Sequence, residues 1–192
     1  IIIAADEGCY IDIFFDEKPM SILEVGKEGI VAFYSLSKRN NMTGYRIGFV
    51  CGDEKILDIF KRLKTNVDSG VQNFVQDAAI AALSDDTHIE TMRRSYREKR
   101  DILLPALKAA GFDARESAAT FYLWQKVPGG DDVEFAKKLL DPSIGIIVTP
   151  GSLISDVCDG GVNPGRGYVR FALVPPLAYV REAVKRLQFL GK

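Results

Sequence analysis

Short continuous runs of apolar residues stand out in the first third of the chain, at 1–5, 29–34 and 46–51. Each run ends at polar or small residues. Runs of this length, separated by loops and helical segments, are typical of buried strands in a mostly parallel sheet. Ligand sites in such sheets lie beyond the carboxyl ends of the strands. The polar residues that follow each run are therefore the first candidates for a site.

Apolar residues at helical spacing predict a series of helices after these runs. We expect them at 53–64, 71–83, 87–110, 132–140 and 177–190. Asp53 can cap the first of them, and Gly111 can end the third. Pro105 lies inside the 87–110 segment, and we expect it to bend or split that helix.

The second half of the chain alternates strands and helices in a different order. Strand-like segments at 120–127, 145–149 and 167–174 are separated by a helix and a Gly-rich loop, an arrangement that favours a small α+β domain. We therefore expect an α/β chain with a part of a mostly parallel sheet in residues 1–95 and a small α+β domain in residues 96–192, bridged by the long helix.

Composition and charge limit the function without defining it. Of the 192 residues 47% are apolar and 27% are charged, and the net charge is −1. These values are ordinary for a globular protein, and no dense cluster of Lys or Arg suggests a nucleic-acid or membrane-surface partner. A single histidine, His88, gives little basis for a Ser/His triad or a His-based metal site. Small molecules or proteins are the expected partners, and no metal is expected.

The cysteines and the chain start bear on location. Cys9, Cys51 and Cys158 lie far apart, with no C-x-x-C pair, which favours a reducing cytoplasm over a disulfide framework. The chain has no apolar run of about 18 residues and no basic region at its start, so neither membrane insertion nor secretion is expected. Because the chain opens with isoleucine directly on an apolar run, we expect it to be a fragment.

The densest chemistry lies in residues 35–48, Ser-Leu-Ser-Lys-Arg-Asn-Asn-Met-Thr-Gly-Tyr-Arg-Ile-Gly, directly after a predicted strand. This segment resembles the cofactor-lysine motif of the fold-type I pyridoxal-phosphate-dependent aminotransferases. In that family a serine three residues before the lysine and an arginine eight residues after it bind the cofactor phosphate. Ser35, Lys38 and Arg46 match those positions, and Ser37 is expected to assist. A lysine in a Ser-rich loop could otherwise be a solvated surface residue.

These residue types suit the chemistry that the resemblance implies. A primary amine can bond covalently to the cofactor aldehyde, yield it to the substrate amine, and then act as the base that moves a proton. A phosphate with nearly two negative charges favours a planar arginine fork and short hydroxyl donors. Lys38 is therefore the expected catalytic residue, and Ser35, Ser37 and Arg46 are the expected phosphate ligands.

Asp6 and Tyr10 are the next cofactor candidates. The family carries an aspartate at a strand end upstream of the lysine, where it pairs with the pyridine nitrogen, and Asp6 matches it. A turn or helix-cap role is the alternative for Asp6. The family's tyrosine to the ring hydroxyl follows by three residues, whereas Tyr10 follows by four. An extra residue would turn a side chain to the other face of an extended segment, unless Gly8 absorbs it as a bulge.

Arg170 lies inside the apolar segment Gly167–Val174 and matches the family's arginine for the substrate α-carboxylate. A buried arginine needs a partner, and a structural ion pair is the alternative to a substrate. The segments 120–124 and 148–152 also resemble the family's small domain. The first of them usually opens with glycine, at the position where either Ala119 or Thr120 stands in this chain.

The resemblance implies a homodimeric aminotransferase of amino-acid biosynthesis, most similar to those of the lysine pathway. Such enzymes act on N-succinyl- or LL-diaminopimelate with glutamate or 2-oxoglutarate. Aspartate or alanine aminotransferase is the alternative within the family. A cofactor-binding effector domain of a transcription regulator, or an interaction module in which Lys38 is incidental, are alternatives of other classes. As the C-terminal part alone, the chain is expected to be inactive or nearly so.

Overall fold

The chain folds into two compact units, the first made of residues 1–93 with 118–120 and the second of residues 94–117 with 121–192. The computed structural model of the chain describes residues 1–8 and 11–190. Each unit contains one three-stranded sheet.

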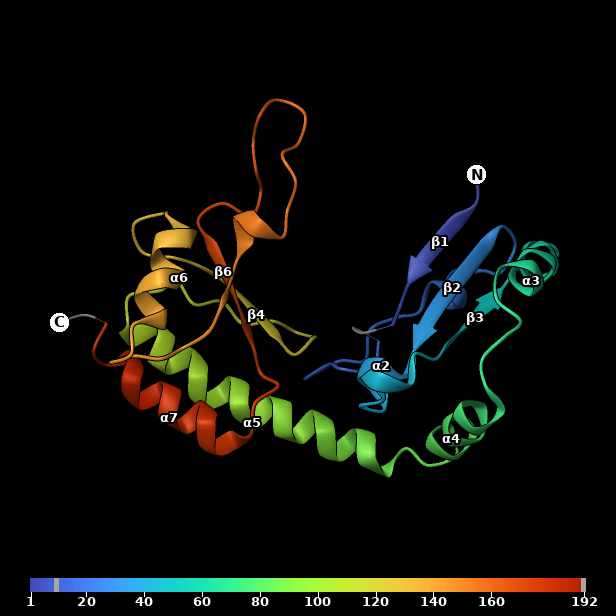
Figure 1. The fold of residues 1–192 in the computed structure, drawn as a ribbon, viewed down its shortest axis with the longest axis horizontal. Helices are drawn as coiled ribbons and strands as arrows, with labels where there is room; N and C mark the ends of the chain where they lie inside the picture. The colour runs from blue at the N-terminus through green and yellow to red at the C-terminus, as the bar shows by residue number, and fades with distance from the viewer. Residues whose placement is uncertain (9–10, 191–192) are drawn as a thin grey trace. The chain divides into compact units, whose positions relative to one another are not determined.

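The sheet of the first unit has the order β1-β2-β3, with strands Ile3–Asp6, Ile30–Ser35 and Gly48–Gly52 (Figure 1). The three predicted strands are thereby confirmed, and polar residues follow them. β1 is parallel to β2, as expected, but β3 runs antiparallel to β2. A parallel return needs a long crossover, whereas the connection from β2 to β3 contains only two short helices.

Burial differs between the strands of this sheet. Ile30, Val31 and Ala32 of β2 are buried, as expected for a central strand. Among the described residues β1 is an edge strand that pairs with β2 alone, and Ile3 is 45% exposed. The prediction that the opening run is a buried strand is therefore wrong for this structure.

Six helical segments of the first unit follow or connect these strands. They are α1 Ile22–Val25, α2 Leu36–Arg39, η1 Thr43–Tyr45, α3 Glu54–Val67, α4 Asn73–Leu83 and the start of α5 Thr87–Ala109. Asp53 caps α3 as predicted, because its side chain accepts from the backbone N–H groups of Lys55 and Ile56 at 2.8 and 3.2 Å. α5 continues into the second unit, and it is not split at Pro105.

The sheet of the second unit has the order β4-β6-β5 and is antiparallel throughout. After α5 the elements of the second unit are β4 Tyr122–Lys126, α6 Asp132–Leu140, β5 Thr149–Pro150, η2 Gly151–Leu153, β6 Tyr168–Ala172 and α7 Leu177–Leu187. The predicted strand at 145–149 is mostly wrong. Ile146 instead donates its backbone N–H to Leu139 of α6 at 2.8 Å and buries its side chain, so the segment follows the helix rather than the sheet.

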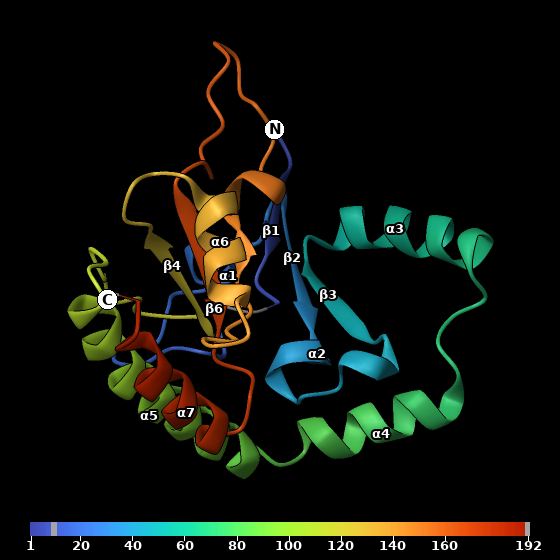
Figure 2. The same ribbon diagram turned by 60° about the vertical axis from the view of Figure 1, so that its left-hand side comes forward.

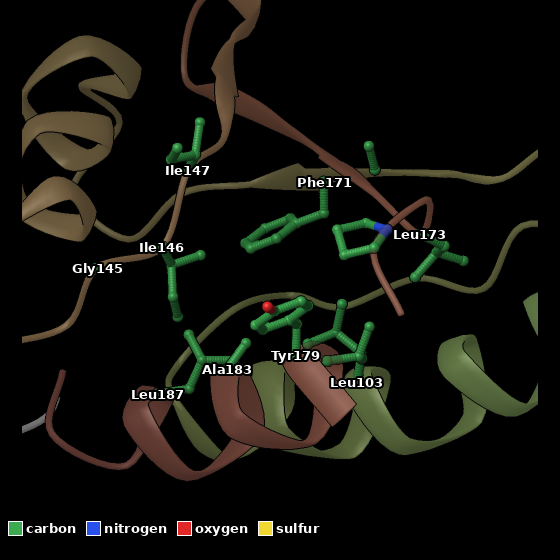
Figure 3. Close-up of a pocket in the computed structure, with 12 residues that line it drawn as sticks. Leu103, Gly145, Ile146, Ile147, Phe171, Leu173, Tyr179, Ala183 and Leu187 are labelled. Carbon is green, nitrogen blue, oxygen red and sulfur yellow. The ribbon is translucent and has the colours of Figure 1, made fainter. Parts of the chain in front are cut away.

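Within the second unit α7 lies beside α5 (Figure 2). Arg181 of α7 pairs with Glu98 of α5 at 3.1 Å. An apolar pocket of about 370 Å³ opens between these helices, β6 and the segment 145–147 (Figure 3). Phe171 of β6 and Leu173, which follows the strand, line the pocket. Since side chains alternate along a strand, Arg170 belongs to the opposite face of the sheet. No helix in the described ranges is long and apolar enough to cross a membrane.

A buried carboxylate closes the Gly-rich loop of the second unit. Asp132 is 2% exposed and accepts hydrogen bonds from the backbone N–H and hydroxyl of Ser152 and from the N–H of Gly167, at 2.9, 2.6 and 3.0 Å. Burial alone would raise the pKa of Asp132, but these donors outweigh it and lower the pKa. Asp132 thus joins the two ends of the loop as a charged acceptor.

Thr120 occupies a strained backbone conformation in the first unit. Its φ is 70°, in the left-handed region that favours glycine, and its N–H donates to the carbonyl of Ile13 at 2.7 Å. The position therefore suits the glycine that the resembling family usually carries here.

We predict that Thr120→Gly raises the free energy of unfolding by about 1 kcal/mol, because relieved strain outweighs the added entropy of the unfolded chain. Equilibrium denaturation with urea measures the change. Ala119→Gly is the matched control, since Ala119 has no positive φ, and it should be destabilising by about 0.5 to 1 kcal/mol. A Thr120→Gly variant with a lower free energy of unfolding would contradict the prediction that the backbone at Thr120 is strained.

Candidate active site

Asp6 and Ser35 lie close together at one edge of the first sheet, the edge at which β1 and β2 end. β1 and β2 are parallel, with Asp6 opposite Phe33, so Ser35 lies two residues farther along β2. Gly8 fits between them. Its N–H donates to Oδ1 of Asp6 at 3.0 Å, and a Cβ at Gly8 would lie 3.2 Å from that oxygen and 3.1 Å from the Cβ of Ser35. The two candidate cofactor ligands are therefore close neighbours, and the space between them admits no side chain without displacement.

Lys38 lies in the short helix α2, which begins directly after β2. The side chain of Ser35 caps this helix by accepting from the N–H of Ser37 at 3.2 Å. The hydroxyl hydrogen of Ser35 stays available as a donor. Ser37 is buried, and its carbonyl accepts from the hydroxyl of Thr43 at 3.0 Å. Lys38 itself is half-buried, so the end of β2 delivers the two serines and the lysine as one local unit.

The residue after Lys38 anchors α2 through ion pairs. Nε of Arg39 lies 3.3 Å from Asp12, and its Nη2 lies 2.7 Å from Asp86. Burial raises the pKa of Asp12, although Arg39 and Arg93 oppose the shift. A partly desolvated arginine with two carboxylate partners fixes the helix more firmly than a solvated side chain could.

Asn40 provides a second anchor on the same side of α2. Its Nδ2 donates to the carbonyl of Ala82 at 2.9 Å and lies 2.9 Å from Nε2 of His88. His88 is the second residue of α5 and lies half-buried against Asn40. Leu36 of α2, Met42 and Ala79 of α4 form a buried hydrophobic cluster. The backbone of Lys38 is thereby held by several parts of the first unit.

Arg46 has an unusual backbone. Its φ and ψ are 52° and 49°, in the left-handed region, and Nη1 donates to the carbonyl of Thr43 at 2.9 Å. A residue other than glycine in this region costs about 1 to 3 kcal/mol, and such strain is common at ligand sites. Arg46 is exposed, which leaves its other guanidinium N–H groups accessible to a ligand.

Arg170 lies in the middle of the second sheet. It is opposite Trp124 on β4 and Thr149 on β5, and its guanidinium carbon lies 4.4 Å from the centre of the Tyr122 ring. This aromatic ring, rather than the carboxylate that a structural ion pair requires, is the partner found for Arg170 within the described residues. The ring supports one face of the guanidinium and leaves its edge available for a planar anion.

The candidate residues therefore divide between the two units. Asp6, Ser35, Ser37, Lys38 and Arg46 belong to the first unit, and Arg170 to the second. Tyr10 lies outside the described residues. Glu7, for which no role is predicted from the sequence, is fully buried beside Asp6. Strand alternation sends Glu7 and Asp6 to opposite faces of the sheet, but the burial of Glu7 depends on the distant residues Tyr34 and Ser21.

Comparison with known proteins identifies the family. Residues 2–187 match the model of aminotransferase class I and II. The LL-diaminopimelate aminotransferase of Nitratidesulfovibrio vulgaris strain Miyazaki F is 39% identical over 97% of this chain and 48% of its own length. The chain thus spans about half the length of the curated relatives that it matches.

Two solved structures extend the comparison. An aminotransferase from Neisseria meningitidis is 39% identical, with a TM-score of 0.90 over 100% of this chain and 50% of its own. A probable N-succinyldiaminopimelate aminotransferase from Thermus thermophilus is 32% identical, with a TM-score of 0.84 over 99% of this chain and 50% of its own. The matched family is pyridoxal-phosphate-dependent. The 192-residue chain belongs to the class I and II aminotransferase family.

Proposed function

We propose that this chain carries the cofactor lysine and the substrate arginine of an aminotransferase that acts on LL- or N-succinyl-diaminopimelate with glutamate or 2-oxoglutarate. The observation that carries the proposal is the grouping of Lys38, Ser35 and Asp6 at one edge of the first sheet. The activity is assigned to the natural polypeptide that contains these 192 residues.

The residues at this edge fit pyridoxal phosphate. The strained Arg46, the hydroxyl of Ser35 and the hydroxyl of Ser37 offer donors of the kind that a phosphate requires. The Asp6 carboxylate, oriented by the N–H of Gly8, offers an acceptor for a protonated ring nitrogen. Gly8 leaves open the space in which a side chain would press on both groups.

When bound, pyridoxal phosphate supplies an aldehyde and an electron-accepting ring. Lys38 would hold the aldehyde carbon covalently, release it to the substrate amine, and then carry the proton from the substrate Cα. Ser35, Ser37 and Arg46 would hold the phosphate, and Asp6 would keep the ring nitrogen protonated. Arg170 would orient the α-carboxylate of the substrate through two parallel hydrogen bonds. Tyr10 stays a predicted ligand of the ring hydroxyl.

The names of the relatives support the substrate class. Relatives named LL-diaminopimelate aminotransferase are 37 to 40% identical to this chain, whereas a solved aspartate aminotransferase from Thermotoga maritima is 29% identical. We therefore prefer a diaminopimelate substrate to aspartate or alanine. The homodimer and the cytoplasmic location stay predictions.

The cofactor assignment can be tested by reducing the natural polypeptide with borohydride in the presence of pyridoxal phosphate and mapping the peptides by mass spectrometry. We expect a phosphopyridoxyl adduct confined to Lys38. Pyridoxal without phosphate is the matched probe, and it should need at least about 10-fold higher concentration, because it lacks the charged group for Arg46 and the serines.

Lys99 provides an internal control for reactivity in this experiment. Burial lowers the pKa of Lys99, and its Nζ donates to the carbonyl of Leu173 at 3.0 Å. A low pKa alone would favour reaction at Lys99, whereas a built site favours Lys38. Adducts scattered over many lysines, or equal labelling by both probes, would overturn the cofactor assignment.

A further inference from the structure

Glu7 is a buried carboxylate for which the proposed chemistry has no use. It is 0% exposed. Its Oε2 accepts from the hydroxyls of Tyr34 and Ser21 at 2.6 and 2.8 Å, and its Oε1 accepts from the backbone N–H of Ile22 at 2.7 Å. A buried carboxylate is costly unless such donors satisfy it, and an apolar side chain of similar size is often as stable in its place. Stability alone therefore does not explain a carboxylate here.

The contacts of Glu7 join three segments that the sequence keeps apart. The residue follows β1, Tyr34 lies near the end of β2, and Ser21 caps α1, where it also takes part in a capping box with Glu24. Tyr34 is held on its other side by Phe49 of β3, with the rings stacked at 4.9 Å. Burial and the bond to Glu7 raise the pKa of the Tyr34 hydroxyl, so it stays a donor at neutral pH.

The position of this network is what connects it to the cofactor site. Neighbouring residues of a strand point to opposite faces. Glu7 adjoins Asp6, and Tyr34 adjoins Ser35. The Glu7–Tyr34 hydrogen bond therefore fixes, from the rear face of the sheet, the two strand ends that carry Asp6 and Ser35 on the front face. Gly8 lies between Asp6 and Ser35, and a Cβ added at Gly8 would lie 3.2 Å from Oδ1 of Asp6 and 3.1 Å from the Cβ of Ser35.

We propose that Glu7 is a positioning residue that sets the separation of Asp6 and Ser35, and thereby matches them to the ring nitrogen and the phosphate of one cofactor molecule. The proposal rests on the proposed function, since it concerns the same site. Glu7 touches neither the cofactor nor the substrate in this assignment. Its effect is transmitted through Tyr34 and the backbone of β1 and β2.

The test compares Glu7→Gln and Tyr34→Phe with the unaltered natural polypeptide. Two quantities are measured, the dissociation constant of pyridoxal phosphate by absorbance titration and the pH midpoint of the bound cofactor's visible absorption. Gln keeps the volume of Glu7 but removes its charge, and Phe removes only the hydroxyl while the ring can still stack on Phe49. We expect both variants to raise the dissociation constant by about 10-fold to 100-fold and to shift the pH midpoint, because small misplacements at a site have effects of this size.

Asp132→Asn is the matched control, because Asp132 is also a buried carboxylate with three donors but belongs to the second unit. It should lower the unfolding midpoint and leave the cofactor's dissociation constant and pH midpoint unchanged. If Asp132→Asn weakens cofactor binding as much as Glu7→Gln, the effect is general destabilisation and the proposal is wrong.

The remaining outcomes separate this proposal from the function on which it rests. If Glu7→Gln does not fold, the dissociation constant and pH midpoint of Tyr34→Phe alone test the proposal. If the unaltered protein forms the Lys38 adduct and the variants bind the cofactor within about 2-fold of it, Glu7 is only structural and the inference fails. If the unaltered protein forms no Lys38 adduct, the proposed function itself fails, and this inference fails with it.

Discussion

Replacing Lys38 with alanine is expected to lower kcat/KM for transamination by the natural polypeptide by at least about 10³-fold. Lys38 is the residue assigned both to hold the cofactor and to carry the proton from the substrate Cα. Loss of a positioned acid–base group alone costs about 10²-fold to 10⁴-fold. The measurement is the steady-state rate with diaminopimelate and 2-oxoglutarate at saturating pyridoxal phosphate.

Two further observations would separate the roles of Lys38. Added small primary amines should restore part of the activity of Lys38→Ala if proton transfer is the step lost. Lys64→Ala is the control, since Lys64 is a partly exposed residue of α3 paired with Asp68, and the activity should stay within about 2-fold of the unaltered protein. Full activity of Lys38→Ala would contradict the proposed role of Lys38 in the mechanism.

The second large effect is expected at Arg170. Arg170→Gln should raise KM for the amino-acid substrate by about 10²-fold, because a charge-assisted, two-pronged contact to the α-carboxylate is lost. Arg170→Lys should recover only part of the affinity, since an ammonium group cannot form two parallel hydrogen bonds in one plane. Initial rates over a range of substrate concentrations give KM and kcat separately.

The matched control for Arg170 is Arg181→Gln. Arg181 belongs to the same unit and forms a surface ion pair with Glu98, so its loss should leave KM unchanged. The dissociation constant of pyridoxal phosphate should be unaffected in both variants, because the proposed phosphate ligands Ser35, Ser37 and Arg46 lie in the first unit. An unchanged KM in Arg170→Gln would indicate that another group binds the carboxylate.

The sequence predicts well those features that depend on local chemistry. The ends of β2 and β3, the cap of α3 at Asp53 and the position of Lys38 after a strand each follow from a few adjacent residues. The helix α1 was missed, although Ser21 and Glu24 form the capping box that predicts a helix start. That signal was present in the sequence and could have been used.

Features that depend on distant partners could not be predicted in the same way. The burial of Glu7 requires Tyr34 and Ser21 to lie close to it. The antiparallel direction of β3 depends on how α2 and η1 lead the chain from β2 back to the sheet. The extended segment before Pro150 has strand-like residues, yet the backbone N–H of Ile146 donates to the carbonyl of Leu139 in α6 instead of to a strand. The left-handed backbone conformation of Thr120 is one that a β-branched residue disfavours, so the local sequence does not predict it.

The anchoring of α2 has a consequence for how this chain can vary. The two residues after Lys38 are bound to the segment after β1 through Asp12, to α4 through Ala82, and to the start of α5 through Asp86 and His88. A change in any of these elements can therefore tilt the backbone of the lysine without touching a ligand. Tolerance to substitution near Lys38 should follow these connections through the first unit rather than distance from the cofactor.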